Sequence, residues 1–193
     1  MNGEFAAGTM LSENELAATL SMSRTPVRAA LTRLQDEGWV TIYAQRGALV
    51  RELTADEVRE SAEVRNALEA AGVRRAGPAA RDGLAGRLAG NLADQERALL
   101  AGDVDAFAVL AMEFHRAFVE AAGNGIMLAL YDRLKDRQYL SILGSAGRIR
   151  SEPREVVAEH RTLLEHASRG DWVAFASALD EHQARRHGLD SAW

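Results

Sequence analysis

Helix-ending signals recur at short intervals along the second part of the chain, and they constrain its fold more than any other feature. Residues 101–103 (AGD) and 169–171 (RGD) each place a glycine directly before an aspartate, and Gly123 precedes Asn124 in the same way. Glycine suits the left-handed position that ends one helix, and aspartate or asparagine suits the cap that begins the next. Connections this short join antiparallel neighbours, so the sequence predicts a helical bundle.

The bundle begins at Thr54. Pro78 and Pro153 fall in gaps between helical patterns, and the segment 144–153 (GSAGRIRSEP) separates the last two helices from the others. Apolar periodicity predicts six helices, at 54–76, 82–101, 103–122, 124–143, 153–169 and 171–188.

Residues 1–53 have a different texture, with short helices followed by runs that resemble strands. Ser12 and Glu15 form a capping box that starts one helix, and a second helix begins near Ser23 after a gap of about three residues. The stretch 39–53 (WVTIYAQRGALVREL) alternates around a turn, which predicts a two-stranded hairpin. The fold class we expect is mainly α: a winged helix-turn-helix domain at 1–53 and an all-α antiparallel bundle at 54–193.

The second helix carries residues suited to DNA. Arg24, Thr25 and Arg28 lie at its N-terminal end, which enters the major groove in a helix-turn-helix. An arginine fork matches guanine O6 and N7, and hydroxyl groups can bind phosphates. Arg46 and Gly47 lie at the tip of the hairpin, a candidate wing. The alternative is a small subdomain with solvated arginines, because acidic residues balance the arginines over 1–53.

Two histidines are expected to face each other inside the bundle. His160 precedes Gly170 by ten residues and His182 follows Asp171 by eleven, so both lie roughly 15–16 Å from the same turn. Each belongs to an apolar stripe, so both should point inward. Buried imidazoles need partners. A shared transition-metal ion would satisfy both, and so would backbone or carboxylate groups.

Taken together, these motifs resemble a known family. The elements SRTPVRxAL at 23–31, LxxEGW at 34–39 and RGAxV at 46–50 are similar to the winged helix-turn-helix of GntR-family bacterial transcription regulators. The following part, beginning EVRNALEAAGVRRAG at 63–77, resembles the all-helical FCD effector domain of the FadR subfamily. The resemblance implies a homodimeric, ligand-responsive repressor that binds two operator half-sites and is released by a small organic acid. It assigns the operator contacts to Arg24, Thr25, Arg28, Arg46 and Gly47.

The chain departs from the family pattern in two places near its start. Relatives usually carry a helix before an xGxFxxGxxL stretch, which here occupies residues 2–11. We therefore expect the first helix of the winged domain to be missing or nearly so, and an upstream start codon is the simplest explanation. Asn14 stands where many relatives have a basic residue, which predicts one weaker phosphate contact.

The resemblance also assigns a metal site. Many FCD domains bind a divalent metal through an Asp-x-x-x-His pair and two further histidines, which His115, His160 and His182 match. The aspartate position is Ala111, and Glu113 points elsewhere on the helix. The implied site therefore holds zinc or nickel through three nitrogens, with more open coordination.

The open position suits an effector that brings its own oxygens. A small carboxylate could bind the metal and take a second hold on an arginine. Arg65 is one candidate because it lies in the family-like motif. Arg133 is another candidate. It follows Asn124 by nine residues and His115 precedes Asn124 by nine, so the two residues are expected at one level of neighbouring helices.

Two other functions remain open from the sequence. Three histidines and a water also form a catalytic zinc site, but this needs a general base, which the sequence does not supply. A dimeric bundle that has lost its effector and metal response would explain Ala111. We expect no catalytic residues and no enzyme activity.

The composition of the chain restricts the kinds of site and the cellular locations that we expect. The chain has no cysteine, which excludes disulfides and thiolate metal sites and suits the cytoplasm. It has no apolar run of membrane-spanning length and no signal-peptide pattern, so we expect no membrane association. A net charge of −5 gives no whole-protein indication of nucleic-acid binding.

Overall fold

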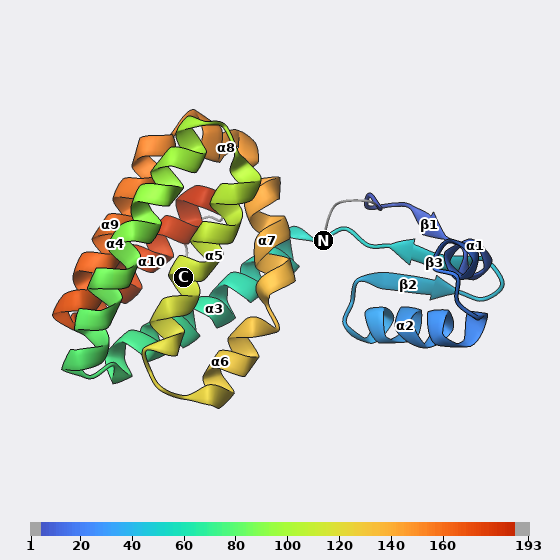
Figure 1. Cartoon of the computed structure of the whole chain (residues 1–193), viewed down its shortest axis with the longest axis horizontal. Coiled ribbons are helices and arrows are strands. Elements are labelled where there is room, and N and C mark those ends of the chain that lie inside the picture. Colours follow the sequence, from blue (N-terminus) through green and yellow to red (C-terminus); the bar gives the residue numbers. More distant parts are fainter. Residues whose placement is uncertain (1–4, 188–193) are drawn as a thin grey trace. The chain divides into compact units, whose positions relative to one another are not determined.

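The computed structural model describes residues 5–187, apart from the side chain of His187, and the chain forms two compact units, Met1–Thr54 and Ala55–Trp193. The first unit combines two helices with a small sheet (Figure 1). Its elements are β1 (Met10–Leu11), α1 (Glu13–Thr19), α2 (Arg24–Asp36), β2 (Val40–Tyr43) and β3 (Gly47–Val50). The described part of the second unit is helical throughout. Its helices are α3 (Ala55–Arg75), α4 (Pro78–Leu100), α5 (Val104–Glu120), α6 (Gly125–Asp132), α7 (Lys135–Gly144), α8 (Ala146–Ser151), α9 (Pro153–Arg169) and α10 (Trp172–His187). The mainly α fold class is confirmed.

The sheet of the first unit holds one strand more than the hairpin predicted from the sequence. β2 and β3 pair antiparallel as expected, and β1 adds to the other edge of β3 through Met10 opposite Leu49. A strand of two residues is too short to show alternation, so the sequence pattern could not reveal it. The sheet and both helices share a small core of Leu11, Ala17, Val27, Leu31, Val40 and Ala48.

Helix caps lie where the sequence predicted them. Asp103 accepts a hydrogen bond from the amide of Ala106, and Asn124 accepts from the amides of Ile126 and Met127. Gly170 adopts the left-handed conformation with φ of 73° and ends α9. These caps satisfy backbone groups that would otherwise be left unpaired at the helix ends.

Three helix predictions need correction. α4 begins at Pro78 rather than at residue 82, because proline is tolerated at the first position of a helix. The single helix expected over 124–143 is two helices, α6 and α7, and the expected separator at 144–153 contains α8. No glycine or proline marks the break between α6 and α7. Different partners anchor the two helices: Tyr131 of α6 donates to Glu69, and Tyr139 of α7 donates to Asp105.

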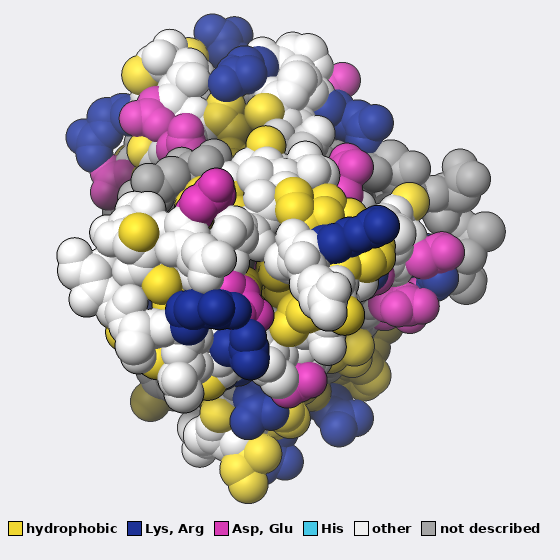
Figure 2. All heavy atoms as spheres, turned by 90° about the vertical axis from the view of Figure 1, so that its right-hand side faces the viewer, with side chains coloured by type: hydrophobic (Ala, Val, Ile, Leu, Met, Phe, Trp, Pro, Cys, Tyr) yellow, Lys and Arg dark blue, Asp and Glu magenta, His cyan; other side chains and the backbone are white. Residues whose placement is uncertain are grey.

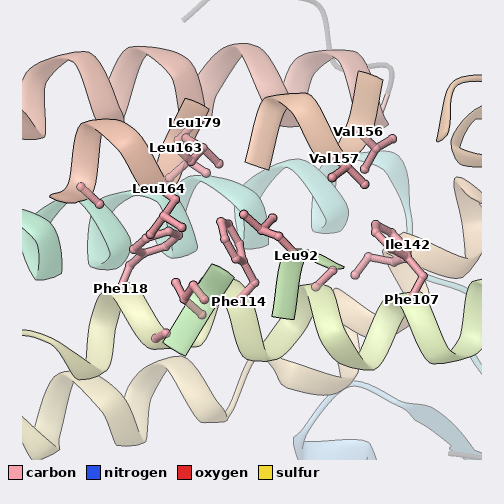
Figure 3. Close-up of a cluster of buried hydrophobic side chains, with 14 of the residues drawn as sticks. Leu92, Phe107, Phe114, Phe118, Ile142, Val156, Val157, Leu163, Leu164 and Leu179 are labelled. Carbon is pink, nitrogen blue, oxygen red and sulfur yellow. The ribbon is translucent and has the colours of Figure 1, made fainter. Parts of the chain in front are cut away.

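The core of the second unit is built around α5, which packs against α3, α4, α6, α7 and α8. Phe114 and Phe118 of α5 are fully buried and lie opposite Leu163 and Leu164 of α9 (Figure 3). α3 crosses α5 at Gly72, where an added Cβ would lie 2.2 Å from the carbonyl oxygen of Phe118. The helices touch backbone to backbone there, so only glycine fits.

No helix in residues 5–187 combines the length and the apolar character that crossing a membrane requires. On the face drawn in Figure 2, arginine and lysine side chains are interspersed with acidic ones rather than gathered into one continuous basic surface.

Candidate metal centre and nucleic-acid interface

The N-terminal half of α2 presents two arginines on one exposed face. Ser23 stands at the N-cap position of the helix, and Arg24 and Arg28 follow one turn apart, with side chains that are 60% and 63% exposed. Residues four apart on a helix share a face. Thr25 is also exposed. The structure therefore brings together three of the residues predicted to contact an operator.

Glu13, at the start of α1, binds both arginines. Its carboxylate accepts hydrogen bonds from Nε and Nη2 of Arg28 at 2.9–3.2 Å, and Nη2 of Arg24 lies 3.5 Å away. The hydrogen bonds from Arg28 lower the pKa of Glu13, and the same contact raises the pKa of Arg28. No local pattern in the sequence singles out Glu13, because its partner Arg28 lies fifteen residues away.

The turn between β2 and β3 carries Arg46, and Gly47 is the first residue of β3. The amide of Arg46 donates to the carbonyl of Tyr43 at 3.0 Å, and the side chain of Arg46 is exposed. Gly47 has φ of 109°, and an added Cβ would lie 2.3 Å from the carbonyl oxygen of Leu11. Glycine is thus required here by the fold itself, because β1 passes directly beside it.

Inside the bundle, the three predicted histidines meet. His115 lies on α5, His160 on α9 and His182 on α10, with exposed fractions of 3%, 1% and 6%. One ring nitrogen from each lies within 4.8 Å of the others, and the Nε2 atoms of His160 and His182 are 3.3 Å apart. Helical counting from the shared turn therefore placed His160 and His182 correctly.

A hydrogen-bond acceptor holds the outer nitrogen of each ring. Nδ1 of His115 lies 2.7 Å from Oε2 of Glu69, Nδ1 of His160 lies 2.6 Å from Oε1 of Gln95, and Nδ1 of His182 lies 2.8 Å from Oε2 of Glu159. A carboxylate or amide oxygen requires the ring nitrogen to donate. The proton therefore stays on Nδ1, and each Nε2 lone pair points inward, as in metal-binding histidines with an outer partner.

The orientation of Gln95 is itself fixed by a polar chain through the core. Asn91 donates to the carbonyl of Leu110, and Gln95 donates its amide nitrogen to Asn91, which leaves the amide oxygen of Gln95 for His160. Phe114 stacks on the ring of His160 with centroids 4.7 Å apart. These contacts fix both the tautomer and the plane of His160.

The charge states of His160 and His182 explain why a cation fits between them. Burial, followed by the nearby His182 and His115, lowers the pKa of His160 well below its ordinary value. Burial likewise lowers the pKa of His182 to about 4, although Glu159 opposes the shift. Both rings are therefore neutral at neutral pH. Two Nε2 lone pairs then face each other at 3.3 Å without a proton between them.

A metal ion suits this arrangement. Zinc–nitrogen bonds of about 2.0–2.1 Å in a tetrahedral site separate two ligand nitrogens by about 3.3–3.4 Å, close to the observed spacing of His160 and His182. A donor set of three imidazole nitrogens is one that zinc and nickel accept. The residues present therefore fit a divalent transition metal.

A cavity of about 30 Å³ adjoins the three histidines, and we call it the histidine cavity. Ala111 contributes only a methyl group to its wall. Its other residues are Arg65, Phe107, Gln138, Ile142, Ile149, Val156, Gln183 and Arg186. Three buried polar atoms in this wall have no hydrogen-bond partner among the described residues: Nε of Arg65, Nε2 of Gln138 and Oε1 of Gln183. A space of this size holds about two water-sized groups, and two of the three unpaired atoms are donors.

Carboxylates compensate the arginines at the two ends of this wall. Glu69 is fully buried and contacts Arg65, His115 and Tyr131. Burial alone would raise its pKa, but these partners, His115 foremost, lower it. Arg186 pairs with both oxygens of Glu159. Burial opposes ionisation of Glu159 too, yet the bonds from His182 and Arg186 lower its pKa to about 2.

The two arginines predicted to hold an effector have different surroundings. Arg65 is 3% exposed and lines the histidine cavity. Arg133 is exposed at the end of α6 and is not among the lining residues. Its neighbour Asp132 pairs with Arg116 of α5, so Arg133 and His115 lie at a similar level, but the side chain of Arg133 is exposed. Glu113 is exposed, as expected for its position on α5.

Sequence reasoning missed the three acceptors behind the histidines. Gln95 had a detectable signal, because it interrupts an apolar stripe formed by Leu88, Leu92 and Leu99 on α4. Glu69 had a weaker one, four residues after Arg65. Glu159 had none, since it neighbours His160 in sequence while binding His182.

Comparisons with known proteins agree with this architecture. Residues 1–50 match the bacterial regulatory proteins of the gntR family, and residues 60–185 match the FCD domain. A relative in Streptomyces ambofaciens, named an uncharacterized HTH-type transcriptional regulator in unstable DNA locus, is 33% identical over 93% of this chain and 75% of its own length. The HTH-type transcriptional repressor RspR of Escherichia coli strain K12 is 29% identical over 92% of this chain and 77% of its own.

Among solved structures, E. coli McbR/YncC superposes with a TM-score of 0.74 at 23% identity, covering 97% of this chain and 89% of its own. At this identity the likeness shows the fold alone. The match of the FCD domain to most of the chain shows the family. The chain belongs to the GntR family of bacterial regulatory proteins, in the group that carries an FCD domain, and it is a transcription regulator rather than an enzyme.

Proposed function

We propose that the chain is a repressor that binds two operator half-sites as a homodimer and is released when a small carboxylate enters a metal-containing bundle. The observation that carries the proposal is the convergence of three buried histidines beside a cavity whose wall holds unpaired donors. Its site of action would be the cytoplasm, where the DNA is.

Operator binding is assigned to α2 and the wing. Arg24, Thr25 and Arg28 would enter the major groove, and Arg46 with Gly47 would approach the neighbouring backbone. The exposure of both α2 arginines and of Arg46 supports this assignment. A dimer would double the contacts and set the spacing of the half-sites.

The metal is assigned to His115, His160 and His182, with zinc or nickel as the ion. Its role would be to supply positive charge at the base of the histidine cavity. Three nitrogen ligands leave a coordination position open. Ala111 leaves space on that side, and the wall of the cavity contains no carboxylate among the described residues.

The effector is assigned to the class of small carboxylic acids. Arg65 has a buried Nε without a partner, and Gln138 offers a second unpaired donor. A carboxylate accepts two hydrogen bonds from such donors and neutralises the local positive charge. The cavity admits little more than one carboxylate group, so the rest of a larger acid would require the wall to open.

The first test is metal content. We expect the full chain, purified without a metal-affinity tag and dialysed against zinc or nickel, to retain about one ion per chain. His160→Ala and His182→Ala should lose it. His166→Ala is the matched control, since His166 lies on α9 outside the cluster. Equal metal in all variants, or none in the unmodified chain, would contradict the metal assignment.

The second test is DNA binding. We expect the full chain to enrich particular duplexes from a randomised pool, and a panel of mono- and dicarboxylates to include acids that weaken binding to those duplexes. A chain that retains metal but responds to no acid would instead be a dimeric bundle without effector control. A chain that enriches no sequence above its salt-sensitive background would refute operator binding.

A further inference from the structure

Glu13 occupies an unusual place for an acidic residue in a DNA-binding surface. It lies on α1, yet its carboxylate touches both arginines that α2 exposes for DNA. A carboxylate so close to groups that would bind phosphates and bases repels the nucleic acid. Its presence in this place therefore calls for a specific role. On the basis of the operator contacts proposed above, we propose that Glu13 is a positioning residue for sequence readout, which orients Arg28 toward a base and keeps both arginines from non-specific phosphate contacts.

The geometry of the contact supports the orienting role. Glu13 accepts from Nε and Nη2 of Arg28, which form one edge of the guanidinium group. The other edge is formed by Nη1 and the second hydrogen of Nη2. Nη1 makes no hydrogen bond with any residue in the described part of the chain. That edge presents two parallel N–H groups, the arrangement that matches O6 and N7 of guanine.

The same contact restrains a flexible side chain before DNA arrives. An exposed arginine loses rotamer freedom when it binds, and prior ordering removes part of that loss. Holding Arg28 in one rotamer favours its contact with a base at one position. A contact with a phosphate gains less, because the side chain can reach phosphates from many rotamers. Glu13 should therefore improve the ratio of specific to non-specific binding.

The charge of Glu13 acts in the same direction. It offsets two arginine charges in the free protein, and the phosphate backbone supplies most of the non-specific affinity through such charges. Removing the carboxylate would let Arg24 and Arg28 reach any phosphate nearby. The affinity for random-sequence DNA should rise after that change, and the affinity for a selected site should rise less.

The experiment compares Glu13→Gln with Glu15→Gln in the full chain. Glu15 lies on the same helix and is exposed, so both variants lose one negative charge at nearly the same place. The probes are a duplex enriched from a randomised pool by the unmodified chain and a random-sequence duplex of equal length. Affinities are measured over a range of salt concentrations, because the charge contribution depends on salt.

We expect Glu13→Gln to bind the random duplex more tightly and with steeper salt dependence. Its preference for the enriched duplex should fall by about two- to tenfold, the range expected for loss of one pre-ordered side chain. Glu15→Gln should change both affinities alike and keep the preference. Glu13→Asp, which retains a carboxylate on a shorter side chain, should give an intermediate preference and tests the same point if Glu13→Gln does not fold.

Three results would overturn the inference. One is an unchanged preference in Glu13→Gln, and another is an equal loss in Glu15→Gln. If the unmodified chain enriches no sequence at all, operator binding itself fails, and the role of Glu13 fails with it. The first two results leave the proposed function intact, so the two failures are distinguishable.

Discussion

Single residues in this chain decide where backbones can meet and what the histidine cavity can hold. Gly72 lets α3 touch α5, and Gly47 lets β1 pass beside the turn of the wing. Ala111 contributes only a methyl group to the wall of the histidine cavity. Each of the three can be tested by adding a small group.

Substituting Gly72 with alanine should destabilise the bundle. The new Cβ would lie 2.2 Å from a backbone oxygen that cannot move alone, so we expect a loss of about 1–3 kcal/mol in the free energy of unfolding. Gly86→Ala is the control, because nothing lies within 4 Å of that position on α4. It should stabilise by about 0.5–1 kcal/mol through helix propensity. Denaturant unfolding measures both, and equal effects would contradict the close crossing.

Replacing Ala111 with aspartate should tighten metal binding. The carboxylate would lie one turn before His115 on α5 and face the histidine cavity. We expect affinity to rise by at least about tenfold, the lower end of what even an outer partner of a metal ligand contributes. Chelator competition measures the affinity, and Ala111→Asn controls for size. Equal affinities in both variants would refute the prediction.

At the scale of elements, seven helices contribute to the histidine site. α5, α9 and α10 supply the rings, while α3, α4 and α9 supply the acceptors behind them. α7 and α8 add Gln138 and Ile149 to the wall of the cavity. Caps and periodicity predicted most of these helices, because a cap or an apolar stripe is a local property of the sequence. The break after α6 and the short α8 could not be predicted this way. Both depend on tertiary contacts, such as the bond from Tyr131 to Glu69.

The same reasoning explains which site residues were predictable. His160 and His182 share one turn, so their levels follow from counting along two helices. Glu69 meets His115 from another helix, 46 residues away, and no local pattern reveals such a pair. Counting along α6 gives the level of Arg133 but not the direction of its side chain, which is exposed.

Gln95 provides a test of the contribution of α4. Gln95→Leu keeps the apolar stripe but removes the acceptor for Nδ1 of His160. We expect metal affinity to fall by about 10–100-fold, because the ring loses its fixed tautomer and orientation. Gln95→Glu retains an acceptor and should keep affinity near that of the unmodified chain. Chelator competition compares the two, and an unchanged affinity in Gln95→Leu would show that α4 does not support the metal.

The whole molecule carries an apolar surface that its own fold leaves open. α6 has the sequence GIMLALYD, yet only Tyr131 of this helix is buried. Ile126 is 77% exposed and Leu130 is 48% exposed. A helix that is apolar yet mostly exposed is typical of a surface that a partner covers, and the proposed dimer would supply one.

Ile126→Glu should therefore shift the chain from dimer to monomer. A charge in an apolar interface loses hydration without gaining a partner, which weakens association. Light scattering coupled to size exclusion measures the mass. Leu100→Glu is the control, since Leu100 is 68% exposed at the end of α4. A dimer that persists in Ile126→Glu, or dissociates equally in Leu100→Glu, would place the interface elsewhere.

The burial of the three histidines has a kinetic consequence. No ring is more than 6% exposed, and the adjoining cavity of about 30 Å³ is lined by side chains of several helices. With the rings this deeply buried, we expect an ion to reach these nitrogens mainly during folding or when helices separate locally. Exchange of the ion would then take place at the rate of such openings. A metal bound in this way would persist through many cycles of acid binding, and cellular metal levels would be registered mainly when new chains fold.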